Sequence, residues 1–221
     1  QSVNFQFSGF GDSRRFLPKI GNSRSDPASV ILAAGKSRRM RSPKPLLEFQ
    51  GKSFLRHIID AHRMASLPVY VVLGEDRHCI EQSVDLSDAS VLVNPDPSRG
   101  QLSSLHTALE RLTDREALVV HPVDHPLVRS QTIQELIDHF RRVSDCILIP
   151  EFQGRKGHPV LFPSRFYPDL KRAPLEEGAR WVVHQNPESE LRVPVDDPGV
   201  VQNINTPAQF EKLSAPDRSS Q

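Results

Sequence analysis

The sequence predicts an α/β fold, a doubly wound and mainly parallel sheet with helices on both faces, similar to a Rossmann fold. Short continuous apolar runs alternate along the chain with segments of helical periodicity. The first two runs, ASVILAA (28–34) and PVYVVLG (68–74), lack the polar alternation of a half-exposed strand, so each is expected to be covered on both faces. A glycine or a polar turn ends these runs, as expected for strands that are joined through helices.

The remaining elements follow the same alternation as far as residue 150. Apolar residues recur at helical spacing in 52–65, 76–84, 102–112 and 130–143, which predicts four helices. Further strands are predicted at 90–94, 116–124 and 145–150. After residue 150 the rhythm changes, with strands expected at 157–163 and 191–195 and helices at 163–170, 176–185 and 206–213. Thr206 is expected to cap the last helix, because Pro207 suits its first position.

Length and composition fit one domain, expected at 28–213, with a poorly ordered extension at 1–27 and a loose tail at 214–221. The net charge of +1 gives no whole-surface reason to bind nucleic acid, and no apolar run approaches the roughly 20 residues of a membrane span. Two cysteines cannot build a zinc cluster and do not indicate a disulfide framework. With no secretory signal recognised, we expect a cytoplasmic protein.

Two Gly-Lys-Ser segments raise the question of an ATPase phosphate loop. Such a loop needs a glycine five positions earlier, but those positions hold Val30 and Leu46, so neither segment qualifies. Four basic residues nevertheless crowd the end of the first strand: Arg38, Arg39, Arg41 and Lys44. They suit a bound polyanion, although a solvated run of charges is the alternative.

In an open parallel sheet, ligands bind beyond the carboxyl ends of the strands. Polar groups and glycines follow several of the predicted strands, notably Gly35 and Lys36, Asn94 and Gly100, and Asp124. We therefore expect a ligand site at this edge, where glycines let the backbone approach the ligand closely.

Six segments occur in an order that resembles a known family. They are LAAGKSRRM…PK (32–44), NPDPSRGQLSSL (94–105), PVDHPLV (122–128), GRKGHPVLF (154–162), EGAR (177–180) and DPGVVQNINTP (197–207). Together they resemble the MobA-like nucleotidyltransferases of the molybdenum cofactor branch, over about residues 28–213. The segments are most similar to those of cytidylyltransferases that transfer CMP from CTP to the molybdenum-bound pterin and release pyrophosphate.

The resemblance implies a role for each matching residue. It implies that Arg39, Lys44 and Asp124 are catalytic and that Mg²⁺ binds Asp124 with Asn203 or Asn205. It also implies that His158 and Arg180 face a molybdopterin-type acceptor. The residues expected to bind the nucleoside triphosphate are Leu32, Ala33, Ala34, Gly35, Lys36, Asn94, Gly100, Ser103 and Ser104.

Three departures from the family pattern bear on these expectations. Arg41 stands where a glycine is usual, His125 where a small or apolar residue is usual, and NINTP replaces DIDTP. The NINTP form resembles the guanylyl branch whereas LAAG resembles the cytidylyl branch, so CTP is favoured and GTP stays open.

Other interpretations remain open from the residues alone. The acceptor could be a sugar phosphate or another phosphorylated metabolite, or the chain could be a non-catalytic module that hands the cofactor to a molybdoenzyme or its maturation factor. His121, Asp124 and His125 could form a zinc site. Asp124 could also be a simple turn residue. The remaining histidines, His62 among them, are given no role.

Overall fold

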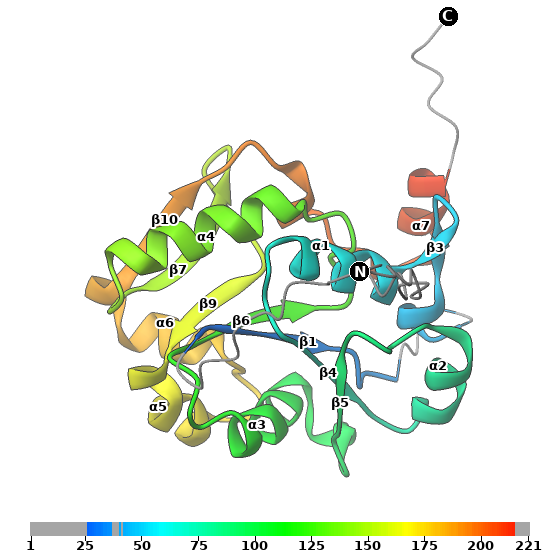
Figure 1. Cartoon of the computed structure of the whole chain (residues 1–221), viewed down its shortest axis with the longest axis horizontal. Coiled ribbons are helices and arrows are strands. Elements are labelled where there is room, and N and C mark those ends of the chain that lie inside the picture. The colour runs from blue at the N-terminus through cyan, green and yellow to red at the C-terminus, as the bar shows by residue number, and fades with distance from the viewer. Residues whose placement is uncertain (1–25, 37–39, 41, 215–221) are drawn as a thin grey trace, which may run out of the picture.

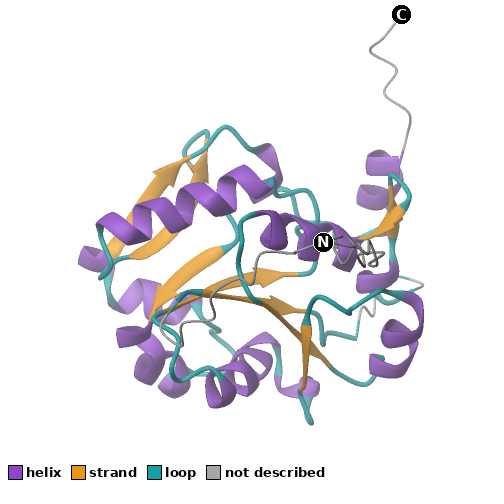
Figure 2. Cartoon of the chain, viewed as in Figure 1, coloured by secondary structure: helices purple, strands orange, loops and turns teal. Residues whose placement is uncertain are grey.

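The computed structural model describes residues 26–36, 40 and 42–214. Nearly all of the predicted extension at 1–27, and the tail after residue 214, lie outside this range, so the domain limits stay a prediction. The described strands form one eight-stranded sheet in the order β10-β7-β9-β6-β1-β4-β5, in which β8 pairs with β7 (Figures 1 and 2). Beside it lies the small antiparallel hairpin of β2 and β3.

The elements follow the predicted alternation, but two are shorter than predicted: the strand expected at 157–163 is only Val160–Pro163, and the helix expected at 176–185 is only Arg180–Gln185. The strands are β1 (Ala28–Leu32), β2 (Glu48–Phe49), β3 (Lys52–Ser53), β4 (Val69–Leu73), β5 (Ser90–Val93), β6 (Ala117–Pro122), β7 (Ile147–Phe152), β8 (Arg155–Lys156), β9 (Val160–Pro163) and β10 (Glu190–Pro194). The α-helices are α1 (Phe54–Met64), α2 (Arg77–Ser83), α3 (Gln101–Arg111), α4 (Ser130–Arg142), α5 (Tyr167–Arg172), α6 (Arg180–Gln185) and α7 (Pro207–Ser214). Short 3-10 turns include η1 (Lys44–Leu46), η2 (Pro97–Arg99) and η5 (Pro198–Val201).

The predicted fold class is confirmed. β1 pairs in parallel with both β4 and β6, and β4 with β5, whereas β9 runs antiparallel to β6 and β7. The chain leaves β1 toward β4 and β5 and then returns to β6 on the other side of β1. The junction of β1 and β6 is therefore the point where the strand order reverses, which is where doubly wound sheets bind their ligands.

Both faces of the sheet are buried, as the continuous apolar runs predicted. On β1, Val30 and Leu32 pack in one core with α3, α5 and α6, whereas Ile31 packs in a second core with α1 and α2. A third core joins α4 to β6, β7 and β10. Figure 1 shows α1 and α4 on one side of the sheet and α3, α5 and α6 on the other.

Side-chain caps set the starts of two helices, α1 and α7. Ser53 caps α1 by accepting a hydrogen bond from the backbone N–H of Arg56 at 3.2 Å. The hydroxyl of Thr206 accepts from the N–H of Gln209 at 3.3 Å, which confirms the predicted cap of α7. No helix among the described residues is long and apolar enough to cross a membrane.

Candidate active site

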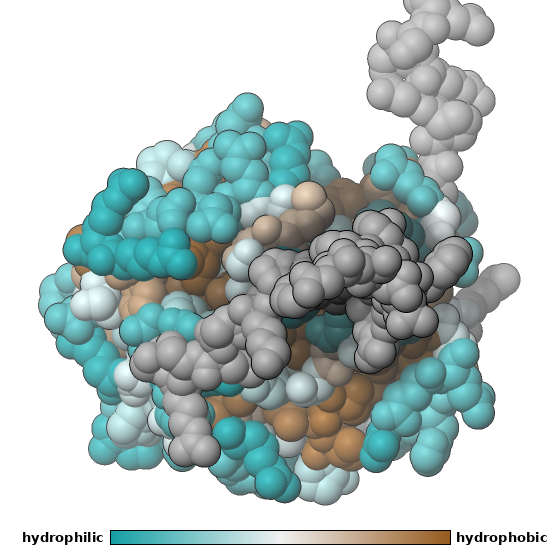
Figure 3. All heavy atoms as spheres, in the orientation of Figure 1, coloured by the Kyte–Doolittle hydropathy of each residue, from teal (hydrophilic) through white to brown (hydrophobic). Residues whose placement is uncertain are grey.

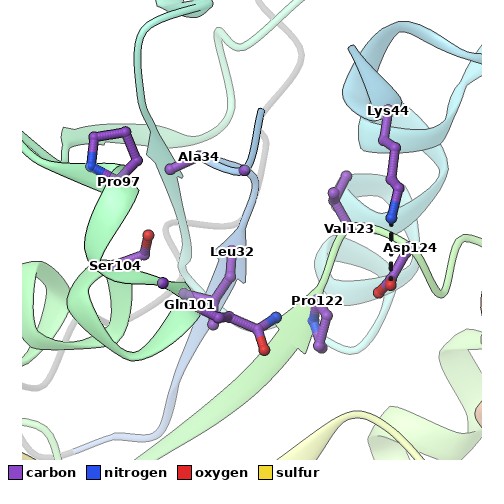
Figure 4. Close-up of a pocket in the computed structure, with 11 residues that line it drawn as sticks. Leu32, Ala34, Lys44, Pro97, Gln101, Ser104, Pro122, Val123 and Asp124 are labelled. Carbon is purple, nitrogen blue, oxygen red and sulfur yellow. Dashed lines mark ion pairs between the residues drawn. The ribbon is translucent and has the colours of Figure 1, made fainter. Parts of the chain in front are cut away.

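A cavity of about 180 Å³ opens at the carboxyl ends of β1 and β6, where the strand order reverses (Figure 4). Its walls come from the ends of β1 and β6 with the segments that follow them, from η2 and from the start of α3. They include Leu32, Ala34, Gly35, Lys44, Pro97, Gly100, Gln101, Ser104, Pro122, Val123 and Asp124. The position is the one expected from the predicted parallel sheet, because carboxyl-end loops of neighbouring parallel strands meet at one edge.

The loop after β1 contributes backbone more than side chains. Leu32, Ala34 and Gly35 line the cavity, whereas Ala33 packs in the core on the α1 side of the sheet. The ammonium of Lys36 lies 2.8 Å from a carboxylate oxygen of Glu75, so this side chain is paired outside the cavity. Because Gly35 and the alanines carry little side chain, the backbone of this loop can approach a bound phosphate closely, although the N–H of Ala33 already donates to the carbonyl of Val72 at 2.9 Å.

Gly74 supports this loop, and the sequence analysis did not single it out. A Cβ added at Gly74 would lie 2.7 Å from the carbonyl oxygen of Ala34, closer than such atoms approach one another. Only glycine therefore fits at the end of β4 without displacing the first loop. The signal in the sequence is the glycine that ends the second apolar run.

Lys44, Asp124 and Asn205 come together at one point from three distant parts of the chain. The ammonium of Lys44 lies 2.5 Å from Oδ1 of Asn205 and 3.6 Å from Oδ2 of Asp124, and Figure 4 shows Lys44 and Asp124 pointing toward one another. A carboxylate oxygen of Asp124 and the amide oxygen of Asn205 thus both face the ammonium of Lys44. Since small divalent cations prefer carboxylate and carbonyl oxygens, Asp124 and Asn205 fit such an ion.

The two asparagines of NINTP lie in different places. The N–H of Ile204 donates to the carbonyl of Asp124 at 2.8 Å, which ties this segment to the turn after β6. Ile204 is buried, and Asn205 next to it reaches Lys44. Asn203 instead lines a separate hollow with Leu127. Of the two predicted ligands, the geometry favours Asn205.

The Asp124 carboxylate is held in its charged form. Burial raises its pKa, but the hydrogen bond and charge of His125 and the charge of Lys44 outweigh this, so the pKa lies below the ordinary value. Nδ1 of His125 lies 3.1 Å from Oδ1 of Asp124. An ionised, partly desolvated carboxylate is the form that binds a cation.

A buried aspartate anchors the segment that carries Asn205, and the sequence analysis gave it no role. Asp197 accepts hydrogen bonds from the N–H of Arg129 at 2.8 Å, the hydroxyl of Thr132 at 2.7 Å and the N–H of Gly199 at 2.9 Å. These bonds join η5 to the start of α4. Asp197 therefore fixes the start of the segment 197–205, which passes the backbone of Asp124.

The segment after β5 is organised by Asn94. Its side-chain amide donates to the hydroxyls of Ser103 and Ser104 at 2.9 and 3.0 Å, and its oxygen accepts from the N–H of Asp96. Gly100 and Ser104 line the cavity, whereas Asn94 and Ser103 lie behind its wall. Asn94 and Ser103 thus support the wall that Gly100 and Ser104 present.

A second cavity of about 230 Å³ adjoins the first and shares Leu32, Gln101 and Pro122 with it. His158 and Arg180 line this cavity, together with apolar side chains of α3, β6 and β9. The ring of His158 packs 4.7 Å from that of His125, and its buried Nδ1 has no hydrogen-bond partner in the described part of the chain. Burial and the charge of His125 lower the pKa of His158 to about 4.

Two further predictions from the sequence concern the catalytic role of Arg39 and a zinc site. Arg39, predicted to be catalytic, lies outside the described residues, as do Arg38 and Arg41. Among the residues described, no three His, Cys, Asp or Glu side chains are grouped to hold a metal ion, which leaves the zinc interpretation without support. His121 of that candidate zinc site is turned into the core and is fully buried.

Comparison with known proteins identifies related chains. A family model described as "MobA-like NTP transferase domain" matches residues 29–190. The chain is 24% identical over 196 residues to a probable molybdenum cofactor guanylyltransferase of Geobacillus sp. (strain WCH70), which covers 84% of this chain and 97% of that protein. This chain is also 34% identical over 113 residues to the bifunctional protein GlmU of Desulfitobacterium hafniense (strain Y51). That match covers 50% of this chain, but the matched region spans only 24% of GlmU.

Solved structures share the fold. The crystal structure of Rv0371c from Mycobacterium tuberculosis H37Rv has a TM-score of 0.73 and 25% identity, and covers 86% of this chain and 97% of that one. A second structure of Rv0371c, described as a complex with manganese, has a TM-score of 0.67 and 23% identity, with 86% and 98% covered.

Proposed function

Because the chain belongs to the MobA-like NTP transferase family, a family of nucleotidyltransferases, we propose that it transfers CMP from CTP to the phosphate of a molybdopterin-type acceptor. The transfer depends on Mg²⁺ and releases pyrophosphate. The observation that carries this proposal is the pair of adjoining cavities at the junction of β1 and β6. One presents Lys44 and Asp124, the other His158 and Arg180.

This pair of cavities suits an in-line transfer between two phosphates. An oxygen of the acceptor phosphate attacks the α-phosphorus of the nucleotide, and the bond from that phosphorus to the β-phosphate bridging oxygen breaks. The attacking and leaving oxygens must lie on opposite sides of the α-phosphorus. Two cavities that meet along Leu32, Gln101 and Pro122 allow the nucleotide and the acceptor to approach in this way.

The chain's own residues neutralise and orient the phosphates. The loop at Ala34 and Gly35 offers backbone N–H groups to the β- and γ-phosphates, and Lys44, with Arg39, neutralises the departing pyrophosphate. Gly100 and Ser104 hold the nucleoside. Mg²⁺ bound by Asp124 and Asn205 would supply charge neutralisation at the transferring phosphate oxygens.

Two basic side chains, Lys156 and Arg180, line the acceptor cavity, and the ammonium of Lys156 lies 2.6 Å from a carboxylate oxygen of Glu190. Arg180 is the group on the rim of this cavity suited to pair with an acceptor phosphate, because guanidinium binds phosphate with two hydrogen bonds. His158 is neutral near pH 7, since its pKa is about 4. The acceptor therefore meets a neutral ring at this position rather than an additional positive charge.

The nucleotide and acceptor are tested separately. Thermal unfolding is measured with each nucleoside triphosphate, with and without Mg²⁺, because a ligand of the folded state raises the apparent melting temperature. The proposal expects a Mg²⁺-dependent increase with CTP; a preference for GTP would move the chain to the guanylyl branch, which the Geobacillus relative's name supports. A panel of phosphorylated acceptors then separates molybdopterin from a sugar phosphate.

Turnover distinguishes an enzyme from a module that only carries the cofactor to a molybdoenzyme. Replacing Asp124 by alanine is expected to abolish pyrophosphate release while the melting temperature stays within a few degrees of wild type. Undiminished transfer by Asp124→Ala would remove the assigned metal ligand from the mechanism. Tight nucleotide binding by the wild-type chain without pyrophosphate release, in the presence of molybdopterin, would favour the carrier.

A further inference from the structure

A chain of hydrogen bonds between fully buried side chains runs from the centre of the sheet to the turn that carries Asp124. It starts at Ser29 on β1, passes through His62 on α1 and His121 on β6, and each of these side chains is 0% exposed. Oγ of Ser29 lies 2.8 Å from Nδ1 of His62, and Nε2 of His62 lies 2.8 Å from Nδ1 of His121. Nε2 of His121 lies 2.9 Å from the carbonyl oxygen of His125.

The direction of the hydrogen bonds follows from the last of them. A carbonyl oxygen can only accept, so Nε2 of His121 carries the proton and its Nδ1 accepts. His62 must then donate from Nε2 and accept at Nδ1 from the hydroxyl of Ser29. This arrangement uses every ring nitrogen once with both imidazoles neutral. Burial lowers the pKa of His62 to about 3 and that of His121 well below its ordinary value, in agreement with neutral rings.

Apolar packing alone does not account for these two histidines. The same buried face of α1 carries Leu55, Ile58 and Ile59. A leucine at position 62 could be buried there without a hydrogen-bond partner, whereas an imidazole loses free energy on burial unless both nitrogens are satisfied. A buried hydrogen-bond network in which every polar atom has a partner holds the groups that it joins in one arrangement.

This series of hydrogen bonds joins the core to the turn that carries Asp124. The N–H of His125 donates to the carbonyl of Pro122 at 3.2 Å, and the N–H of Ile204 donates to the carbonyl of Asp124 at 2.8 Å. His121 holds the turn from the core side, through the carbonyl of His125. The backbone on both sides of the Asp124 side chain is thus held by bonds from different elements.

We infer that His62 and His121 are positioning residues, which hold the Asp124 carboxylate where it binds the metal ion. This inference rests on the metal role of Asp124 in the proposed function. His121 acts directly on the turn, and His62 acts by orienting the ring of His121. Partners that orient a metal ligand without touching the metal typically change metal affinity by about 10- to 100-fold when removed.

The test uses the purified full chain and Mn²⁺, whose binding is followed by electron paramagnetic resonance without any acceptor. His121→Leu is expected to weaken Mn²⁺ binding by about 10-fold and to accelerate hydrogen exchange at the amide of Ile204. His121→Gln keeps an N–H that can reach the His125 carbonyl, so it is expected to restore most of both losses. His62→Leu leaves every residue of the turn in place and is measured as the second variant, which decides the question if His121→Leu does not fold.

The matched control is His106→Leu on α3. Nε2 of His106 lies 2.8 Å from the carbonyl oxygen of Leu170, so this variant also removes a histidine-to-carbonyl bond, but one that joins α3 to α5 and not to the turn that carries Asp124. It is expected to lose stability without losing Mn²⁺ affinity. The inference is wrong, while the proposed function stands, if folded His121→Leu or His62→Leu changes Mn²⁺ affinity and Ile204 exchange no more than the control does. A wild-type chain that binds no Mn²⁺ would overturn it together with the metal site of the proposed function.

Discussion

The burial of His62 predicts how the stability of this fold depends on pH. The ring is fully buried and hydrogen-bonded in its neutral form, and its pKa falls from the ordinary 6.5 to about 3 on folding. Below pH 6.5 the unfolded chain therefore binds a proton at His62 that the folded chain does not. The free energy of unfolding must decrease as the pH falls from about 6.5 toward 3, because acid favours the state that binds more protons.

The size of the effect between pH 7 and pH 5 follows from these two pKa values. At pH 5 the unfolded histidine is almost fully protonated, whereas the folded one is almost fully neutral for any folded pKa below about 4. The protonation of the unfolded chain then lowers the free energy of unfolding by about 2 kcal/mol for this one residue. Carboxylates such as Asp60 and Asp124, whose pKa values are lowered on folding, keep their contribution in this interval, because it is lost only around and below pH 4.

Urea unfolding at pH 7 and pH 5 measures this difference. Between pH 7 and pH 5 the free energy of unfolding of His62→Leu is expected to fall by about 2 kcal/mol less than that of wild type, since leucine does not titrate. Ser29→Ala removes the hydroxyl that donates to His62 but keeps the imidazole, and it should retain the pH dependence of wild type. Equal pH dependence of His62→Leu and wild type would show that this imidazole is not kept neutral by the fold.

Three further substitutions test the site and its supports. Lys44→Met should lower kcat by about 100-fold in steady-state assays and raise the pKa of Asp124, because the charge of Lys44 lowers it; an unchanged kcat would exclude Lys44 from the transfer. Gly74→Ala should weaken nucleotide binding by about 10-fold in calorimetry, since the added Cβ would displace the Ala34 carbonyl; wild-type affinity would mean that the first loop does not need this position. Asp197→Ala should cost about 3 kcal/mol in urea unfolding, as three donors lose their acceptor; a loss below about 1 kcal/mol would contradict the anchoring role.

The alternation of apolar runs and helical patterns was sufficient to predict the fold class. Periodicity is a local property, so a buried strand such as β1 and an amphipathic helix such as α1 can be recognised from their own residues. The position of the cavity also followed, because the carboxyl ends of parallel strands meet at one edge. Gly35, Lys44, Gly100, Ser104 and Asp124 were expected at that edge, whereas Leu32 was expected only from the family resemblance, and all six line the cavity.

Relations between distant residues depended on the tertiary structure. Lys44 and Asn205 are 161 positions apart and meet only because the Ile204 segment crosses the turn after β6. No periodic pattern showed that Asn205, rather than Asn203, would face Asp124.

The tertiary structure also decided which polar residues face the ligand and which support the fold. Asn94 resembled a ligand-binding residue but turned inward to organise the wall of the cavity. His62 looked like an ordinary position on a helix but became part of a buried chain that ends beside Asp124. A polar side chain lowers its free energy by finding partners, and folding alone determines which partners lie within reach.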